Sequence, residues 1–221
     1  WMPYFQVADC DATAARAGKL GAKRKHKLHA SSAVFGHYNG AKRHNGCAEG
    51  NITIYWFAHG WIWFIPLKDG TTSVGAVCWP YYLNGRDKPL KDFFADTIAM
   101  APKLAARLEG AQLVDDRVWA TGNYSYAASH CCGERYAMLG DAYTFIDPVF
   151  SSGVYLAMNS AFAAVGMVNA TLDGHSAEAS AARKRFEKVM AKGPKDFSWF
   201  IFRMTNPVMR QLLLHPKNPL R

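Results

Sequence analysis

The sequence lacks several features that would place it in a familiar class. Its five cysteines contain no CxxC pair, so neither a disulfide framework nor a zinc site is indicated. No GxGxxG turn marks a dinucleotide-binding unit, and no charged-then-apolar leader opens the chain. No convincing repeat or low-complexity linker divides the 221 residues. We therefore expect one domain in a reducing cytoplasm, without a metal.

A long, fully apolar run is also missing. The longest weakly polar stretch, residues 153–170, is rich in alanine and is interrupted by Asn159, Ser160 and Asn169. That composition is typical of a helix buried against a sheet rather than of a membrane span. The sequence therefore predicts no association with a membrane.

Acidic residues are scarce, with 17 Asp and Glu against 26 Lys and Arg and a formal net charge of +9. A compact basic cluster occupies Lys23 to Lys27. A solvated loop is its simplest interpretation, and an acidic protein partner or another polyanion is the alternative. The chain has no recognisable nucleic-acid motif, so we expect no nucleic-acid partner.

The most informative stretch runs from Tyr136 to Ala157. An apolar run ends at Gly140-Asp141, a short loop follows, and a helix is expected to begin near Ser152-Gly153. A helix start offers free backbone N–H groups to an anion or an electron-rich ring, and an acidic residue after a strand can accept hydrogen bonds from a chain of hydroxyls. These features suit the ribityl chain and ring edge of a flavin. An ordinary turn followed by an N-cap is the simpler alternative.

The pattern elsewhere predicts an α+β fold with an antiparallel sheet. Glycines at 46, 50, 60 and 70 indicate hairpins, and proline and glycine bound a helix over 89–110. A helix is expected to follow Ser152, and another over 176–204 should be interrupted near Gly193-Pro194. The expected strands cover residues 1–9, 32–38, 51–57, 60–67, 71–79, 114–126 and 136–139, and a short helix covers 11–21.

Two segments resemble one family. The run from Gly140 to Ala157 resembles the GDAAxFxDPxFSSGVxLA segment of FAD-dependent monooxygenase-fold enzymes, above all the flavin-dependent, tryptophan halogenase-like enzymes. Residues 60–67 carry the WxWxIP pattern used as the halogenase signature within that fold, although a half-buried strand alone would explain its alternating tryptophans. The resemblance implies three sets of site residues. They are the cofactor contacts Gly140, Asp141, Pro148, Ser151 and Gly153; the halide contacts Ser152 and Gly153; and the active-site wall of Trp61, Trp63, Ile65, Pro66 and Phe150.

The resemblance also has gaps. Family members open with a GxGxxG unit, and their catalytic lysine lies in that upstream part, so no lysine here inherits its role. A DASGR-like turn is replaced by Asp9 to Thr13 without the glycine. We therefore interpret residues 1–221 as a single incomplete FAD-binding and substrate domain whose N-terminal dinucleotide-binding unit is missing. Such a fragment alone should be inactive.

The chemistry that the resemblance implies is oxidative halogenation. FAD, reduced by a partner flavin reductase, reacts with oxygen to a hydroperoxide, and a bound halide ion then gives hypohalous acid. Phe150 stands where tryptophan halogenases carry a glutamate, which favours a phenol or pyrrole substrate, in some relatives tethered to an acidic carrier protein, in secondary-metabolite biosynthesis. His37, His59 and His130 are expected to be structural. An FAD-dependent hydroxylase or reductase of the same fold remains an alternative, as does a non-catalytic remnant or polyanion-binding module.

Overall fold

The computed structural model describes residues 22–23, 31–122, 124–133, 136–206 and 208–209. The chain divides into two compact units, one of residues 27–124 and the other of residues 1–26 and 125–221. The strand and helix expected within residues 1–21 lie outside the described residues, as do residues 24–27 of the basic cluster. The interpretation as a single incomplete domain stays a prediction.

The unit of residues 27–124 is built on an antiparallel sheet. Its strands are β2 (Ser32–Asn39), β3 (Thr53–Phe57), β4 (Gly60–Pro66), β5 (Thr72–Cys78), β6 (Gln112–Leu113) and β7 (Trp119–Thr121). Their order is β3-β4-β5-β2-β6, and β7 also pairs with β2. The four expected strands between residues 32 and 79 are therefore confirmed. The hairpins at Gly60 and Gly70 are confirmed as well, but β2 pairs with β5, so Gly46 and Gly50 lie in a crossing connection instead.

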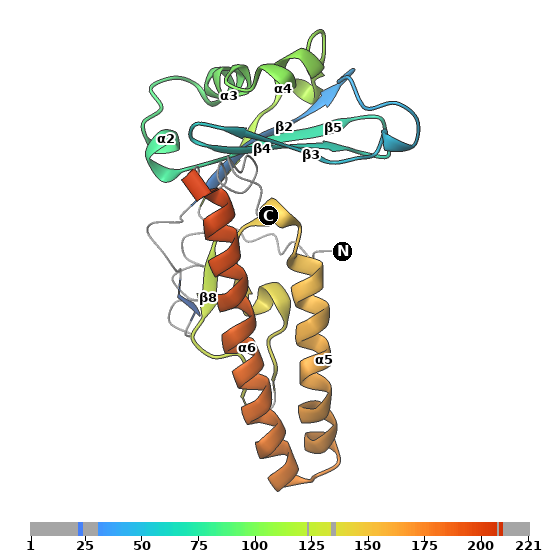
Figure 1. The fold of residues 1–221 in the computed structure, drawn as a ribbon, viewed down its shortest axis with the longest axis vertical. Helices are drawn as coiled ribbons and strands as arrows, with labels where there is room; N and C mark the ends of the chain where they lie inside the picture. Colours follow the sequence, from blue (N-terminus) through green and yellow to red (C-terminus); the bar gives the residue numbers. More distant parts are fainter. Residues whose placement is uncertain (1–21, 24–30, 123, 134–135, 207, 210–221) are drawn as a thin grey trace, which may run out of the picture. The chain divides into compact units, whose positions relative to one another are not determined.

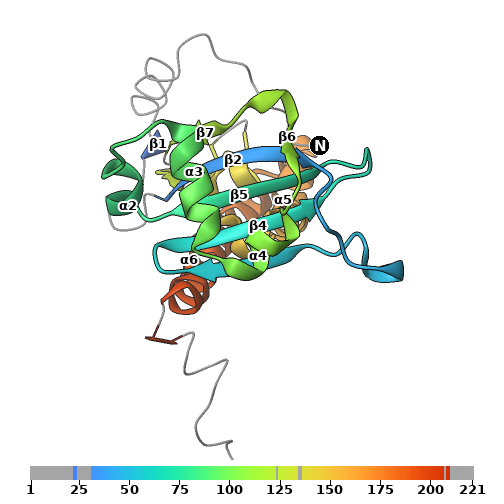
Figure 2. The same ribbon diagram turned by 90° about the horizontal axis from the view of Figure 1, so that it is seen from above.

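Helices cover one face of this sheet, as Figure 2 shows. They are α3 (Leu90–Ala99) and α4 (Pro102–Arg107), whereas α2 (Pro80–Asn84) lies at one end of the sheet; the short turn η3 (Val114–Asp116) follows α4. The single helix expected over 89–110 is wrong, because Pro102 has no N–H to continue α3 and instead begins α4. Alternate residues of the strands pack beneath the helices around Ile62, Phe64, Phe94 and Leu104.

The second unit contains two long helices joined by a short turn (Figure 1). Its elements are β1 (Ala22–Lys23), β8 (Tyr126–Ala128), η4 (Gly140–Ala142), β9 (Thr144–Phe145), η5 (Pro148–Phe150), α5 (Gly153–Leu172) and α6 (Ser176–Thr205). The helix after Ser152 is confirmed. A core of Cys131, Cys132, Ala164, Met167, Ala182, Phe186 and Met190 joins the two helices to the preceding loop.

Two expectations for this unit are wrong. Residues 136–139 do not form a strand, because only Ala137 makes a bridge, to Cys132. Helix α6 is not interrupted at Gly193 but continues through Pro194. The mixture of helices and antiparallel strands confirms the α+β class.

Candidate functional site

The Gly140-Asp141 turn is tied directly to α5. Gly140 has a φ of 49°, and a Cβ added there would lie 2.7 Å from the Cβ of Ala157. Its N–H donates to the hydroxyl of Ser160 at 2.9 Å, and that hydroxyl donates to the carbonyl of Ala157 at 2.7 Å. Only glycine both adopts this backbone conformation freely and lets the helix approach so closely. The glycine of the motif therefore fixes the turn against the helix.

The Asp141 side chain lies at the start of α5. Its Oδ1 is 3.8 Å from the position that a Cβ on Gly153 would take. The backbone carbonyl of Asp141 accepts a hydrogen bond from the Tyr126 hydroxyl, but its carboxylate has no hydrogen-bond donor within the described part of the chain. Partial burial raises the pKa of Asp141 above its usual value. This carboxylate is positioned to accept hydrogen bonds from a bound molecule.

A short segment leads from the turn into the helix. The Asp147 carboxylate accepts from the N–H of Val149 at 2.9 Å, and Pro148 begins η5. Ser151 then adopts the left-handed conformation at φ 51° and ψ 32°, which turns the chain toward α5. Ser152 is the N-cap of α5, but its side chain makes no capping hydrogen bond.

Within the part of the chain that the structure describes, the N–H groups of the first turn of α5 therefore have no side-chain acceptor. Helices usually satisfy these groups with a capping oxygen, and an uncapped end attracts anions through its backbone dipole. Gly153 adds no side chain that would shield them. The structure thus brings the predicted cofactor and halide residues together within one short stretch of a single unit.

Aromatic residues of α6 support this stretch. Phe150 packs against Phe200 with their ring centroids 5.1 Å apart, and Tyr155 packs near Phe197 at 6.2 Å. The supporting roles of Ser160, Tyr126 and Phe200 were not expected. Only the spacing of Ala157 and Ser160, three residues apart on one helical face, gave a signal that they meet a common neighbour.

The other predicted wall residues lie on β4. Trp61, Trp63 and Ile65 are on the sheet face opposite the α3 and α4 core, whereas Pro66 ends the strand on the same side as Ile62 and Phe64. Trp61 and Trp63 are neighbours on the face opposite the core, with ring centroids 6.1 Å apart. The Trp63 indole N–H donates to the Ser73 hydroxyl at 3.1 Å, and its ring lies over Gly75, where an added Cβ would be 2.1 Å from the ring. Phe35 stacks on Trp119 beside them. The expectation that the alternating tryptophans share one face is confirmed.

The predicted wall is divided between the two units. Trp61, Trp63, Ile65 and Pro66 belong to the sheet unit, whereas Phe150 belongs to the helical unit. Trp61 is 2% exposed, and its indole N–H has no hydrogen-bond acceptor among the described residues. Ile65 and Pro66 are half-buried at the end of β4.

Among the described residues, none of the three histidines forms an ion pair with a carboxylate, although His37 lies near enough to Asp69 to contribute to the lowered pKa of that carboxyl group. His59 stacks on Tyr82 at 4.3 Å, and its Nδ1 lies 3.0 Å from the Tyr81 hydroxyl. His37 lies beside the Trp119 ring at 5.9 Å, and His130 is exposed. These contacts fit the structural role expected of them.

Comparison with known sequences gives a consistent family. The tryptophan halogenase family profile matches residues 41–206. The chain is 34% identical over 189 residues to the flavin-dependent halogenase armH2 of Armillaria mellea. This match covers 77% of this chain and 35% of armH2. It is also 36% identical over 135 residues to the sulochrin halogenase gedL of Aspergillus terreus. That match covers 59% of this chain and 24% of gedL.

A solved structure gives the same result. The myxobacterial chondrochloren halogenase CndH, an FAD-dependent enzyme, superposes with a TM-score of 0.73 at 28% identity. The match covers 86% of this chain and 45% of the neighbour. The chain thus spans about a quarter to a third of the two curated relatives and just under half of this structural neighbour.

Proposed function

Because this chain belongs to the tryptophan halogenase family, we propose that the complete protein is a flavin-dependent halogenase of an electron-rich aromatic ring. In this proposal the helical unit supplies the flavin and halide contacts, and the aromatic face of the sheet unit supplies part of the substrate wall. The proposal concerns the complete protein, because this chain spans only part of the length of its relatives.

One observation carries the flavin assignment. The Asp141 carboxylate has no hydrogen-bond donor among the described residues, and it lies beside the start of α5, where the Ser152 side chain makes no capping bond. A partly buried carboxylate with a raised pKa is destabilised unless donors reach it. The hydroxyls of a ribityl chain are donors of this kind, and the nearby helix end favours negative charge on a reduced flavin ring. Gly140, Pro148 and Ser151 shape the backbone that the cofactor would lie against. The residues present therefore fit FAD.

The halide is proposed to lie at the N–H groups of Ser152 and Gly153. FAD, when bound in its reduced form, activates oxygen so that a halide is oxidised to hypohalous acid. The chain's own contribution is to hold the anion by backbone dipoles and to keep water from the reacting atoms. Trp61, Trp63 and Phe150 are suited to excluding water because their rings are large and their positions are fixed by packing.

The substrate is proposed to be a phenol or pyrrole, free or tethered to an acidic carrier. Phe150 offers no carboxylate for deprotonating a ring of low reactivity, so the ring itself must be electron-rich. The name of one relative, sulochrin halogenase, gives that protein's substrate. A net charge of +9 supports an acidic carrier. A separate flavin reductase and a cytoplasmic location complete the proposal.

The test uses the protein expressed from its complete reading frame. Reduced FAD, oxygen, chloride or bromide and a panel of free and carrier-tethered phenols and pyrroles are supplied, and products are identified by mass spectrometry. We expect halogenated product, and we expect Gly153→Val to abolish it, because the added side chain crowds the anion at the start of α5. Loss of product while FAD stays bound would assign the defect to the halide site and not to the cofactor. Ser152→Ala should retain more activity, because the Ser152 side chain makes no capping bond. Hydroxylated product formed without halide would instead favour the hydroxylase.

A further inference from the structure

Helix α6 carries a row of lysines on its outer side. Positions three or four residues apart lie on one face of a helix, and a row of such positions in α6 is exposed. The row consists of Lys184, Lys188, Lys192, Lys195 and Trp199. It extends about 22 Å along the helix axis at 1.5 Å per residue. We call these residues the α6 stripe.

The lysines of the α6 stripe are poorly neutralised. Lys192 pairs with Asp196, but Lys184, Lys188 and Lys195 form no ion pair with another described residue. Lysines four residues apart on a helix repel each other and lower its stability. Three lysines of the sheet unit, by contrast, each have a carboxylate partner, in the pairs Lys42–Glu109, Lys88–Asp96 and Lys91–Asp116. The α6 stripe therefore presents positive charge that an acidic surface would neutralise.

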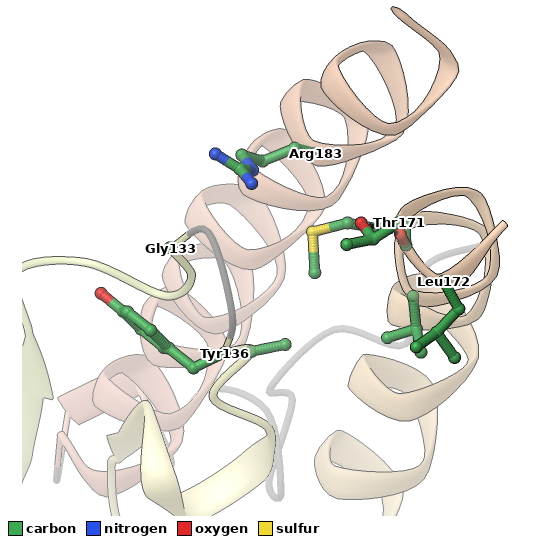
Figure 3. A pocket seen from close by; sticks show the side chains of 8 residues that line it. Gly133, Tyr136, Thr171, Leu172 and Arg183 are labelled. Atoms are coloured by element: carbon green, nitrogen blue, oxygen red, sulfur yellow. Dashed lines mark hydrogen bonds between the residues drawn. The ribbon is translucent and has the colours of Figure 1, made fainter. Parts of the chain in front are cut away.

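The charged neighbours of the α6 stripe are directed elsewhere. Arg183 lines a separate hollow together with Tyr136 and Leu172 (Figure 3). The Oε1 of Glu187 accepts a hydrogen bond from the Cys132 thiol at 3.6 Å. Glu187 is consequently engaged with the loop that precedes α5, and it does not neutralise the α6 stripe.

The α6 stripe ends at an exposed aromatic ring. Trp199 is 58% exposed, and the guanidinium of Arg203 lies over its ring at 3.6 Å from the centroid. The Nη1 of Arg203 also donates to the backbone carbonyl of Trp199 at 3.3 Å. Tryptophan and arginine are the residues that most often anchor protein–protein interfaces, and a ring that is already held loses little freedom on binding. This end of the α6 stripe is therefore suited to contact with a protein.

A hollow of about 350 Å³ adjoins the α6 stripe within the same unit. Lys195 and Trp199 line this hollow and also belong to the α6 stripe, and Tyr126 lines it from β8. The hydroxyl of Tyr126 donates to the backbone carbonyl of Asp141, so the hollow lies next to the proposed flavin turn. A partner bound to the α6 stripe is thus positioned to place a flexible chain beside that turn.

An anionic membrane fits the α6 stripe less well than a protein does. Helices that lie on membranes insert an apolar side beside their lysines. The apolar side of α6 is instead buried against α5 through Phe186 and Met190. Helix α5 is the one described helix whose length and composition would suit a membrane, and it lies on the side of α6 opposite the stripe. A flat bilayer would therefore not contact both.

We propose that the α6 stripe is the docking surface for an acidic helix of a carrier protein, and that the adjoining hollow receives the arm to which the substrate is tethered. Charge complementarity supports this occupant, because a row of lysines that ends in an exposed ring matches a row of carboxylates beside an apolar patch. The identity of the partner rests on the proposed function. Docking itself requires no halogenation, so the two are tested separately.

The test measures affinity by fluorescence anisotropy, using the protein expressed from its complete reading frame and a labelled holo carrier protein without substrate. Lys184→Glu/Lys188→Glu should weaken binding about tenfold or more at low ionic strength. Lys68→Glu/Lys103→Glu is the matched control, because it makes the same change of net charge at two exposed lysines of the sheet unit. The control should retain most of the affinity. Both variants should keep the thermal midpoint and the FAD affinity of the unchanged protein.

Charge reversal on the carrier gives a second readout. A carrier with lysines in place of the glutamates of its acidic helix should bind the unchanged protein weakly and Lys184→Glu/Lys188→Glu more tightly. Halogenation kinetics give a third. The KM for the tethered substrate should rise about tenfold in Lys184→Glu/Lys188→Glu, while kcat/KM for a free phenol is unchanged.

Several results would overturn the proposal. No binding of the holo carrier, or equal weakening in the two double variants, would show that the α6 stripe is not its docking surface. Binding to phosphatidylcholine–phosphatidylglycerol vesicles or to duplex DNA that depends on Lys184 and Lys188, without carrier binding, would assign the stripe to a membrane or to nucleic acid. Halogenation of a free phenol without carrier binding would reject docking alone. Carrier binding without any halogenation would reject the proposed function and retain docking.

Discussion

Replacing Asp141 by asparagine should separate flavin binding from folding. Burial raises the pKa of this carboxyl group, so folding disfavours its charged form, and no donor among the described residues compensates it. Asparagine has nearly the same shape and no charge. We therefore expect Asp141→Asn to be at least as stable as the original chain, although it removes a charged hydrogen-bond acceptor for the cofactor.

The pH dependence of the stability follows from the direction of the shift. The pKa of Asp141 is higher in the folded state than in the unfolded state. Its contribution to the free energy of unfolding is therefore fully present below the unfolded-state pKa of Asp141 and is lost as the pH rises through the folded-state pKa. The stability advantage of Asp141→Asn should therefore be small near pH 3 and larger at pH 7. Urea unfolding of both proteins at the two pH values measures it.

The loss of FAD affinity in Asp141→Asn can be calculated from the strength of one hydrogen bond. A charge-assisted hydrogen bond to a ribityl hydroxyl contributes about 1.5–3 kcal/mol, which corresponds to a roughly tenfold to hundredfold weaker affinity for FAD. Flavin fluorescence titration of the complete protein measures this loss. A variant that is less stable at pH 7 and binds FAD as before would refute the reasoning, because Asp141 would then be a structural turn residue.

Three further changes test other contacts. Gly140→Ala should lower the free energy of unfolding by about 1–3 kcal/mol, because alanine strains the left-handed conformation and meets the backbone of α5; urea titration measures it. Gly75→Ala should displace the Trp63 ring that lies over it, which would shift the tryptophan emission, and an unchanged spectrum would contradict the observed packing. Burial raises the pKa of Cys78 and Cys132 to about 12, so above pH 9 the unfolded chain alone loses these protons. Stability should then fall by up to about 1.4 kcal/mol per thiol and pH unit, as urea titrations at pH 8 and 10 would show.

The sequence was most informative where a local pattern decides the structure. Side chains alternate between the two faces along the strand at residues 60–66, which places Trp61 and Trp63 together on one face and Ile62 and Phe64 on the other. The break between α3 and α4 was also legible in Pro102, and the expectation of one helix failed because the apolar spacing was given more weight than the missing N–H. The left-handed residue before α5 was not legible, because it is Ser151 and not a glycine.

Contacts between distant segments were beyond a single sequence. Residues 136–139 are apolar enough for a strand, yet the described residues supply no partner strand for them, and only Ala137 forms a bridge. Burial of the helix after Ser152 against a sheet was expected from its composition, but within the described residues it packs on α6. The hydroxyl of Ser160 and the ring of Phe200 became part of the site only through tertiary packing.

Pro194 has a mechanical consequence for the site. Because proline has no N–H, the carbonyl of Met190 lacks the donor that would lock this turn of α6, and the helix is weakest to bending there. On one side of this point, Phe186 anchors α6 in the core; on the other, Phe200 supports Phe150. Bending at this turn would move Phe200, which packs against Phe150, while Phe186 stays in the core. The packing of Phe150 therefore depends on the part of α6 that follows Pro194, and the core contacts of Phe186 do not.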